Sequence, residues 1–324
     1  MLRKERLLTA LKHQQPDRVP FVDYVDAEIR EVFAGKKDYQ QWEVAQALNM
    51  DGVFYEILPP VFAHIKNVGG RKMISEGLIK TPDDITKLQE YLPDPSKASF
   101  YDEAKKFLDE NGPSGLALIA RQRMGAAPTI LSLGVETFSY LLFDNPMVIE
   151  NTLEIYCNWS IEVINHLSRL GFDVFWFYDD IAFNSAPFFS PQTFKQIFLP
   201  RLKRVAECVQ LPWVFHSDGN LLPILDDLLS LGMNALHPIQ PEAMDIEEVA
   251  ELYGESVCII GNIDVNLLCT GTPEQVEELV KFRIEKLRHN KGGYILSSSN
   301  SIPGFCKPEN ALAIGRAIER YGYY

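Results

Sequence analysis

A histidine, a serine and an aspartate stand together where an apolar strand is expected to turn into a loop. The stretch reads VFHSDGN over residues 214–220, so His216 and Asp218 precede the turn-forming pair Gly219 and Asn220. An imidazole exchanges a proton near neutral pH, and a carboxyl group does so when its surroundings raise its pKa. The two side chains are therefore candidates for general acid–base catalysis or for binding a metal ion.

Comparable side chains occur at the expected ends of the other strands. They are Asp23, Tyr24, Tyr55, Glu56, Arg121, Tyr178, Asp179, His237, Gln240, Asn262 and Asn300, with Glu242 shortly after Gln240. A ring of such groups around one hollow would form a candidate active site. We predict that the catalytic residues are His216, Asp218, Glu56 and Asp179. We predict that the substrate-binding residues are Tyr24, Tyr55, Arg121, Tyr178, His237, Gln240, Asn262 and Asn300.

Each of these residues also has a purely structural interpretation. Asp179 or its neighbour Asp180 would cap the turn that follows them, and Asp218 would form an Asx turn before Gly219. His216 would be a hydrogen-bonded imidazole of the core, and Arg121 would belong to a structural ion pair. A fold that gathers the strand ends on one face favours catalysis over these alternatives.

Strand-like and helix-like segments alternate along the whole chain. The apolar runs that we predict as strands are 18–25, 51–58, 115–121, 173–180, 213–219, 234–240, 257–264 and 294–300. Amphipathic segments lie between them, and several open on Ser-Pro or Thr-Pro and end on Gly. This alternation predicts parallel strands joined by helical crossovers, and eight such units predict an α/β fold of the (β/α)8 TIM barrel type.

A barrel brings the carboxyl ends of its strands to one mouth, where barrel enzymes carry their chemistry. Residues 59–114 are long for one crossover and show no clear strand, so we predict a helical insertion after strand two. The alternative is a doubly wound sheet, but the turn DYVDAEI after the first strand lacks the glycines of a phosphate-binding loop. We expect a single barrel domain over residues 1–324.

Composition excludes several classes of function. The formal net charge of −13 disfavours non-specific binding to nucleic acids or anionic membranes, because both need a basic surface. No run approaches the about 20 apolar residues of a membrane helix, and the N-terminus lacks the long apolar core of a secretory signal. The five cysteines include no CxxC pair, so we expect reduced thiols and a cytoplasmic protein.

The sequence resembles the uroporphyrinogen decarboxylase superfamily over nearly its whole length. The resemblance rests on RLLTALKHQQPDRVPF near the start, GFDVFWFYDD, SPQTFKQIFLPRLKRV and FHSDGNLLPILDDLLSLG in the middle, and GNIDVNLLCTGTPEQVEELV and GGYILSSSNSIPGFCKPENALA towards the end. It implies a (β/α)8 barrel with its site at the mouth. It also implies one of two chemistries, which are decarboxylation of a porphyrinogen and methyl transfer to or from a corrinoid protein.

The decarboxylases of this superfamily carry an arginine-rich segment, RQAGRY, after the first strand. The corresponding segment here is FVDYVDAEIREVF, in which Arg30 stands alone, although Glu56 keeps an acidic position. An acidic rim would repel a substrate with many carboxylates. The resemblance therefore favours a corrinoid-dependent methyltransferase, with a decarboxylase of tetrapyrrole metabolism as the alternative and a non-catalytic binding barrel as a third interpretation.

Thiol-methylating members of the methyltransferase branch bind zinc through a His-x-Cys pair and a later cysteine. Here His216 is kept, Asp218 and the stretch 298–301 replace the thiolates, and Cys306 lies a few residues late. Zinc held by His216, Asp218 and Glu242 is consistent with the oxygen ligands that zinc accepts.

The resemblance then implies demethylation of a small O- or N-methylated compound, for which an aromatic compound is one candidate. A partner protein would carry the corrinoid, because the chain has no Asp-x-His-x-x-Gly corrinoid motif. A homodimer is compatible with this interpretation.

Overall fold

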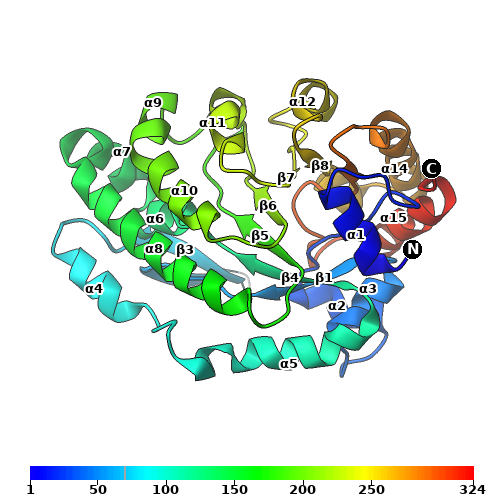
Figure 1. Cartoon of the computed structure of the whole chain (residues 1–324), viewed down its shortest axis with the longest axis horizontal. Helices are drawn as coiled ribbons and strands as arrows, with labels where there is room; N and C mark the ends of the chain where they lie inside the picture. Colours follow the sequence, from blue (N-terminus) through cyan, green and yellow to red (C-terminus); the bar gives the residue numbers. More distant parts are fainter. Residues whose placement is uncertain (69–70) are drawn as a thin grey trace.

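The centre of the protein is a curled sheet of seven parallel strands. The computed structural model describes residues 1–68 and 71–324. The strands follow the order β1-β4-β5-β6-β7-β8-β9. They are β1 (Gly52–Glu56), β4 (Ala117–Gln122), β5 (Val174–Tyr178), β6 (Trp213–His216), β7 (Ala235–His237), β8 (Cys258–Ile260) and β9 (Tyr294–Ile295). Helices cover the outer side of the sheet (Figure 1).

The predicted alternation of strands and helices is confirmed. The helices are α1 (Arg3–Leu11), α2 (Ala27–Ala34), α3 (Gln41–Ala47), α4 (Asp84–Tyr91), α5 (Asp102–Asn111), α6 (Ala126–Leu133), α7 (Val135–Asp144), α8 (Pro146–Leu167), α9 (Pro191–Thr193), α10 (Leu199–Glu207), α11 (Leu225–Leu229), α12 (Ile246–Tyr253), α13 (Val265–Thr270), α14 (Pro273–Leu287) and α15 (Pro308–Tyr321). The expected Ser-Pro and Thr-Pro starts act as caps: Ser190 Oγ accepts from the Thr193 amide, and Thr272 Oγ1 accepts from the Gln275 amide. No single helix among the described residues is long and apolar enough to cross a membrane, and only α6 and α7, bent by 97°, meet that test as a pair.

The first predicted strand, 18–25, pairs through isolated bridges instead of a continuous ladder. Phe21 bridges Leu296 and Val25 bridges Ile302, both in parallel. The Asp51 amide also donates to the Phe21 carbonyl at 2.7 Å. The segment therefore lies between β9 and β1, the two ends of the sheet. Pro20 has no amide hydrogen to donate, which explains why a regular strand does not form there.

The insertion after β1 departs from the helical one predicted. Besides α4 and α5 it contains an antiparallel pair, β2 (Ala63–Val68) and β3 (Arg71–Gly77). Most described side chains of β2 are exposed, so the strand shows no alternation of apolar and polar residues that sequence could reveal. A Cβ on Gly77 would meet the backbone of α6 at 2.4 Å, so only glycine permits this close approach.

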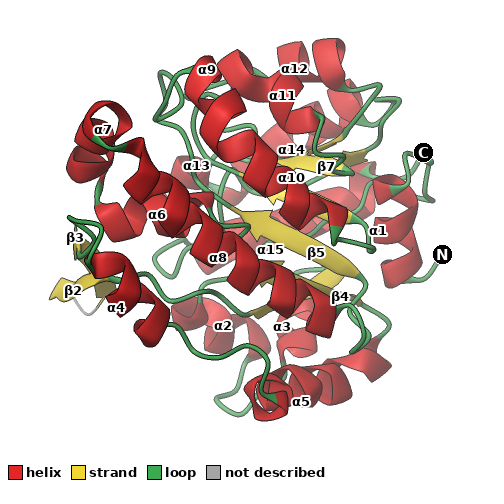
Figure 2. Cartoon of the chain, turned by 60° about the vertical axis from the view of Figure 1, so that its left-hand side comes forward, coloured by secondary structure: helices red, strands yellow, loops and turns green. Residues whose placement is uncertain are grey.

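An apolar layer fills the inside of the curled sheet, separate from the layer between sheet and helices. Phe54, Ile119 and Trp176 belong to this inner layer, together with Leu7 and Leu11 of α1. Because α1 packs against the amino end of the strands, the carboxyl end is left as the mouth. Figure 2 shows both chain termini on one side of the molecule and α7 with the β2–β3 pair on the other.

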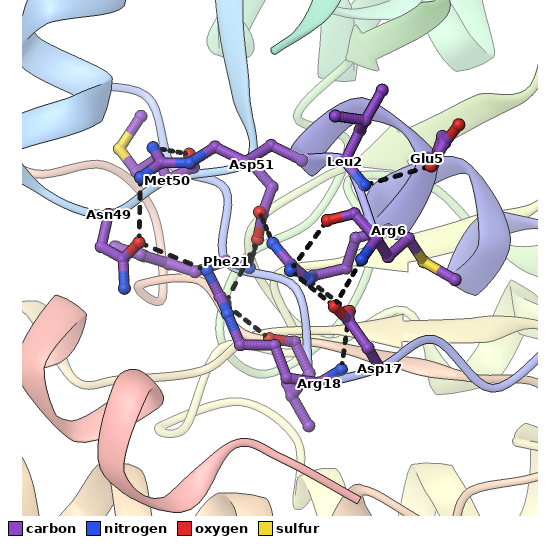
Figure 3. A network of polar contacts seen from close by, with 12 residues as sticks. Leu2, Glu5, Arg6, Asp17, Arg18, Phe21, Asn49, Met50 and Asp51 are labelled. Atoms are coloured by element: carbon purple, nitrogen blue, oxygen red, sulfur yellow. Dashed lines mark hydrogen bonds and ion pairs between the residues drawn. The ribbon is translucent and has the colours of Figure 1, made fainter. Parts of the chain in front are cut away.

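A buried ionic network ties α1 to the start of β1, at the end away from the mouth (Figure 3). Arg6 donates to Asp51 Oδ1 at 2.7 Å and to Asp17 Oδ1 at 2.6 Å. Arg18 and the Phe21 amide reach Asp51 Oδ2 at 3.4 and 2.8 Å. The Asp51 side chain is completely buried, so its charge depends on these partners.

We expect Asp51→Ala to lower the free energy of unfolding by about 3–5 kcal/mol, because it leaves two buried guanidinium groups without their shared carboxylate. Urea denaturation measures the change. Glu255→Ala is the matched control, since the pair of Glu255 with Lys291 is about three-quarters exposed and such pairs contribute about 0–1 kcal/mol. Equal losses in the two variants would show that the network is not stabilising.

Candidate active site

Three neighbouring strands bring the predicted histidine to the mouth. Tyr178, His216 and His237 are the last residues of β5, β6 and β7 and lie side by side in register. Asp180 and Asp218 each follow two residues after a strand end. The His216 Nε2 atom lies 3.5 Å from Asp180 Oδ1 and 3.7 Å from Asp218 Oδ1. We refer to Asp180, His216 and Asp218 as the Asp-His-Asp cluster.

The other nitrogen of the His216 ring contacts a second histidine. His216 Nδ1 and His237 Nδ1 are 2.6 Å apart, and His237 Nε2 lies 3.1 Å from Ser297 Oγ. Burial, and next the charge of His216, lowers the pKa of His237 well below its ordinary value. Two nitrogens at this distance share one proton, so one ring donates and the other accepts. This pair orients His216 with its Nε2 atom towards the two carboxylates.

The two carboxyl groups of the cluster have different surroundings. Burial raises the pKa of Asp218, and the nearby charge of Asp180 acts in the same direction. Burial alone would raise the pKa of Asp180 as well, but the hydrogen bond with His216 and the charge of that ring bring it below its usual value. Asn300 Nδ2 donates to Asp218 Oδ2 at 2.5 Å. Asp218 Oδ1 is buried and has no hydrogen-bond partner among the described residues.

The donor set of the cluster fits a divalent cation. One imidazole nitrogen and two carboxylate oxygens lie within 4.8 Å of one another. Zinc accepts both kinds of ligand, and the unpartnered Asp218 Oδ1 atom is free to coordinate. Glu242, predicted as the third ligand, is outside the cluster and accepts from Gln240 and Asn266, both at 3.3 Å. Asp180 takes its place, and the cluster holds no cysteine.

Asp179, predicted to be catalytic, lies at the start of α6. Its carboxylate accepts from four successive backbone amides, those of Met124 at 2.8 Å, Gly125 at 3.0 Å, Ala126 at 3.4 Å and Ala127 at 2.9 Å. The side chain is fully buried, which raises its pKa to about 6. The carboxylate thus caps α6 instead of the turn after β5, so Asp179 positions that helix, and its catalytic role stays a prediction.

A wall of stacked side chains stands beside the cluster. The guanidinium carbon of Arg121 lies 3.9 Å from the centre of the Tyr24 ring and 3.8 Å from that of Tyr178. Arg121 also donates to Glu56 Oε2 at 2.6 Å. The Tyr178 ring meets His216 edge-on, with centres 6.2 Å apart. We call Glu56, Arg121, Tyr24 and Tyr178 the arginine–tyrosine wall.

Tyr55 does not share this position. Its ring packs on Phe107 and Phe172, with centres 5.4 and 5.9 Å away, in the layer between sheet and helices. Successive residues of a strand face opposite sides, so Phe54 and Glu56 point to the other side of β1. The strand alternation therefore turns the Tyr55 ring away from the wall, and its role in substrate binding stays a prediction.

The remaining predicted residues support the loops around the cluster. Gln240 Oε1 accepts from the Gly219 amide at 2.9 Å, next to Asp218. Asn262 is buried and donates to the Ile239 carbonyl at 2.6 Å. Asp23 was noted at a predicted strand end but given no role; it accepts from the Ser298 amide at 2.7 Å, and burial raises its pKa to about 7. These contacts fix the loop ends, and the Asp-His-Asp cluster is the candidate reactive centre.

Comparison with known proteins is consistent with this geometry. The uroporphyrinogen decarboxylase (URO-D) family matches residues 68–321. The methylcobamide:CoM methyltransferase MtaA of Methanosarcina barkeri is 25% identical over 191 residues, or 58% of this chain and 54% of that protein. MtaA of M. barkeri strain Fusaro gives the same values. The chain thus spans about half the length of the curated relatives it matches.

A solved structure shows the same fold over the whole chain. A methyltransferase from Methanosarcina mazei superposes with a TM-score of 0.78 at 20% sequence identity, covering 99% of both chains. The family predicted from the sequence motifs is confirmed by the URO-D match over residues 68–321. The chain belongs to the uroporphyrinogen decarboxylase family, and the proteins that it resembles are methyltransferases.

Proposed function

We propose that the protein is a methyltransferase of a corrinoid-dependent demethylation system. It moves a methyl group between a small O- or N-methylated compound and a corrinoid protein. The Asp-His-Asp cluster is the observation that carries the proposal, because it places an imidazole between two carboxylates at the ends of β5 and β6. The similarity to MtaA, a methylcobamide methyltransferase by name, supports the same chemistry. In this proposal the segment 18–25 closes the sheet into a barrel, and residues 1–324 form one domain.

The chemical task of the cluster is to stabilise the leaving group. When a methyl–oxygen or methyl–nitrogen bond breaks, the electron pair stays on the oxygen or nitrogen, and an alkoxide or phenoxide leaves poorly. The reduced corrinoid of the partner supplies the nucleophile that accepts the methyl group. When no cation is bound, His216 Nε2 would donate a proton to the leaving atom, and general acids of this kind contribute about 10²–10⁴-fold to rates.

Asp180, His216 Nε2 and Asp218 would also be the ligands of a divalent cation. Such an ion polarises the leaving oxygen or nitrogen as a Lewis acid. His237 then has a defined role, because accepting the Nδ1 proton of His216 leaves the Nε2 lone pair facing the carboxylates. Outer partners that hold a ligating histidine in this way are typical of metal sites.

The arginine–tyrosine wall is the proposed substrate-binding surface. Arg121 holds Tyr24 and Tyr178 in fixed positions by stacking between them, and Glu56 fixes Arg121. Rigid aromatic rings beside the cluster suit a flat methylated substrate, since aromatic pairs favour stacked or edge-on contact. An aromatic methyl ether is the substrate class that we propose for this surface.

A screen of methyl donors tests the proposal. The purified protein is mixed with reduced cobalamin and, in turn, with methoxylated aromatic compounds and methylated amines, while absorbance follows the conversion of the reduced cobalamin. We expect methylation with at least one aromatic methyl ether, and none without the protein. Release of carbon dioxide from a porphyrinogen, with no methyl transfer from any donor, would instead establish the decarboxylase alternative.

A further inference from the structure

Arg123, the residue directly after β4, carries a positive charge that no acidic side chain of the described chain neutralises. Among the described residues its guanidinium forms no ion pair and no hydrogen bond, and its Nε atom is buried without a partner. Charged groups that are withdrawn from water are normally paired, because desolvation of an isolated charge is unfavourable. A partly buried guanidinium in this state is a candidate binding site for an anion.

The alternation of side chains along β4 directs Arg123 into the mouth. Gln122 donates from Nε2 to the Ser160 carbonyl of α8 at 3.5 Å, so its side chain faces the helices. The residues before and after it face the opposite side, and Arg121 accordingly belongs to the arginine–tyrosine wall. Arg123 extends this wall, because its guanidinium carbon lies 4.6 Å from the centre of the Tyr178 ring.

The Tyr178 ring connects Arg123 with the reactive centre. Its centre lies 4.6 Å from the Arg123 guanidinium carbon and 6.2 Å from the centre of the His216 ring. Burial raises the pKa of Asp180, but the contacts with His216 and the positive charge of Arg123 bring it below its usual value. A molecule with a single benzene ring is therefore long enough to contact Arg123 at one end and the Asp-His-Asp cluster at the other.

The acidic side chains of the mouth have other partners. Glu56 accepts from Arg121 at 2.6 Å. Asp180 lies 3.5 Å from the imidazole of the cluster, and Asp179 accepts from four backbone amides of α6. Because these carboxylates are engaged elsewhere, the charge of Arg123 is available to a ligand.

We propose that Arg123 binds a carboxylate on the methylated substrate, an inference that rests on the proposed function. The substrate is then an aromatic acid that also carries the methyl ether. Its ring lies along Tyr178, its carboxylate contacts Arg123, and its methoxy oxygen meets the cluster. A guanidinium offers two parallel N–H donors that match a carboxylate in geometry and charge. The alternative, that Arg123 only stacks on Tyr178, predicts no preference for an anionic substrate.

Arg123→Gln tests the inference with two kinds of methyl donor, the positional isomers of methoxybenzoate and the neutral methoxybenzene. With reduced cobalamin as acceptor, we expect the unmodified protein to use at least one methoxybenzoate with a kcat/KM about 10–100-fold above that of methoxybenzene, the range that a hydrogen bond to a charged group contributes. Arg123→Gln should remove this preference by raising KM for methoxybenzoate, and it should keep the kcat/KM of methoxybenzene.

Two further variants control this experiment. Arg123→Lys should restore part of the preference, because lysine keeps the charge but not the paired donors. Arg169→Gln is the matched control and should change neither kcat/KM, because it removes an exposed arginine in the turn before β5, at the amino end of the strands.

Calorimetry with methoxybenzoate in the absence of a corrinoid separates this inference from the proposed function. Binding that weakens by about tenfold or more in Arg123→Gln, without methyl transfer from any donor, would keep the anion site and refute the methyltransferase. Equal kcat/KM for charged and neutral donors in the unmodified protein would refute the anion site, as would an equal loss with both donors in Arg123→Gln. A preference abolished by Arg30→Gln, which removes the guanidinium 5.5 Å from the Tyr24 ring, and kept in Arg123→Gln would refute it too.

Discussion

Replacing His216 with alanine should reduce kcat for methyl transfer by at least about 10²–10⁴-fold while the protein stays folded. His216 is the centre of the cluster, since its Nε2 atom lies within 3.7 Å of both carboxylates. Without the imidazole, a proton donor or metal ligand is lost at the leaving group. Single-turnover rates with the donor found in the screen, in the presence of excess reduced cobalamin, measure this effect on the chemical step.

Folding needs its own control, because His216→Ala also leaves the buried His237 without its partner. An unsatisfied buried polar group costs about 1–3 kcal/mol. His216→Asn can still bond to His237 and should be as inactive as the alanine variant, with a smaller loss of stability. His289→Ala, exposed and at the end of the molecule away from the mouth, should keep full activity. Retained turnover in both His216 variants would remove this residue from the mechanism.

The fold was predictable where burial imposes a pattern on the sequence. Strands β4 to β8 are buried and apolar, and the helices between them are amphipathic, so their alternation indicates parallel pairing. The prediction of secondary structure failed in two segments that lack this pattern. Pro20 prevents a continuous ladder in segment 18–25, and the exposed strand β2 has no buried face to impose a period.

The position of the candidate site in the fold could be predicted from the sequence. The particular residues that form it could be predicted only in part. His216 and Asp218 lie at the end of β6, and the rule that barrels work at the carboxyl ends of strands is sufficient to select them. Which of Asp179 and Asp180 faces His216 depends on the direction of each carboxylate. Four backbone amides at the start of α6 donate to Asp179, so its carboxylate points to that helix. A single sequence contains no signal for that choice. For Tyr55, in contrast, the strand alternation with Phe54 and Glu56 already predicts that its ring faces the helices.

The second large expected effect concerns a bound metal ion. The structure offers Asp180 as the third ligand side chain, whereas the sequence predicts Glu242. We expect elemental analysis of the purified protein to find close to one divalent ion, zinc by preference, for each chain. Asp218→Ala and Asp180→Ala should each lose most of it, because each removes one of the three ligand side chains found among the described residues. Loss of such a ligand should also lower activity by at least the 10–100-fold that the removal of outer partners costs.

Glu242→Ala is the matched control, because it also removes a carboxylate, but one that lies outside the Asp-His-Asp cluster. It should keep the metal if Asp180 is the third ligand, and lose it if the set predicted from sequence is correct. His237→Phe addresses the outer contact: it removes the acceptor of His216 Nδ1 without removing a ligand, so metal affinity should fall by about 10–100-fold. Full activity in protein that contains no metal would show that the cluster acts only as a proton donor, and the two carboxylates would then serve to hold His216 and its proton beside the leaving group.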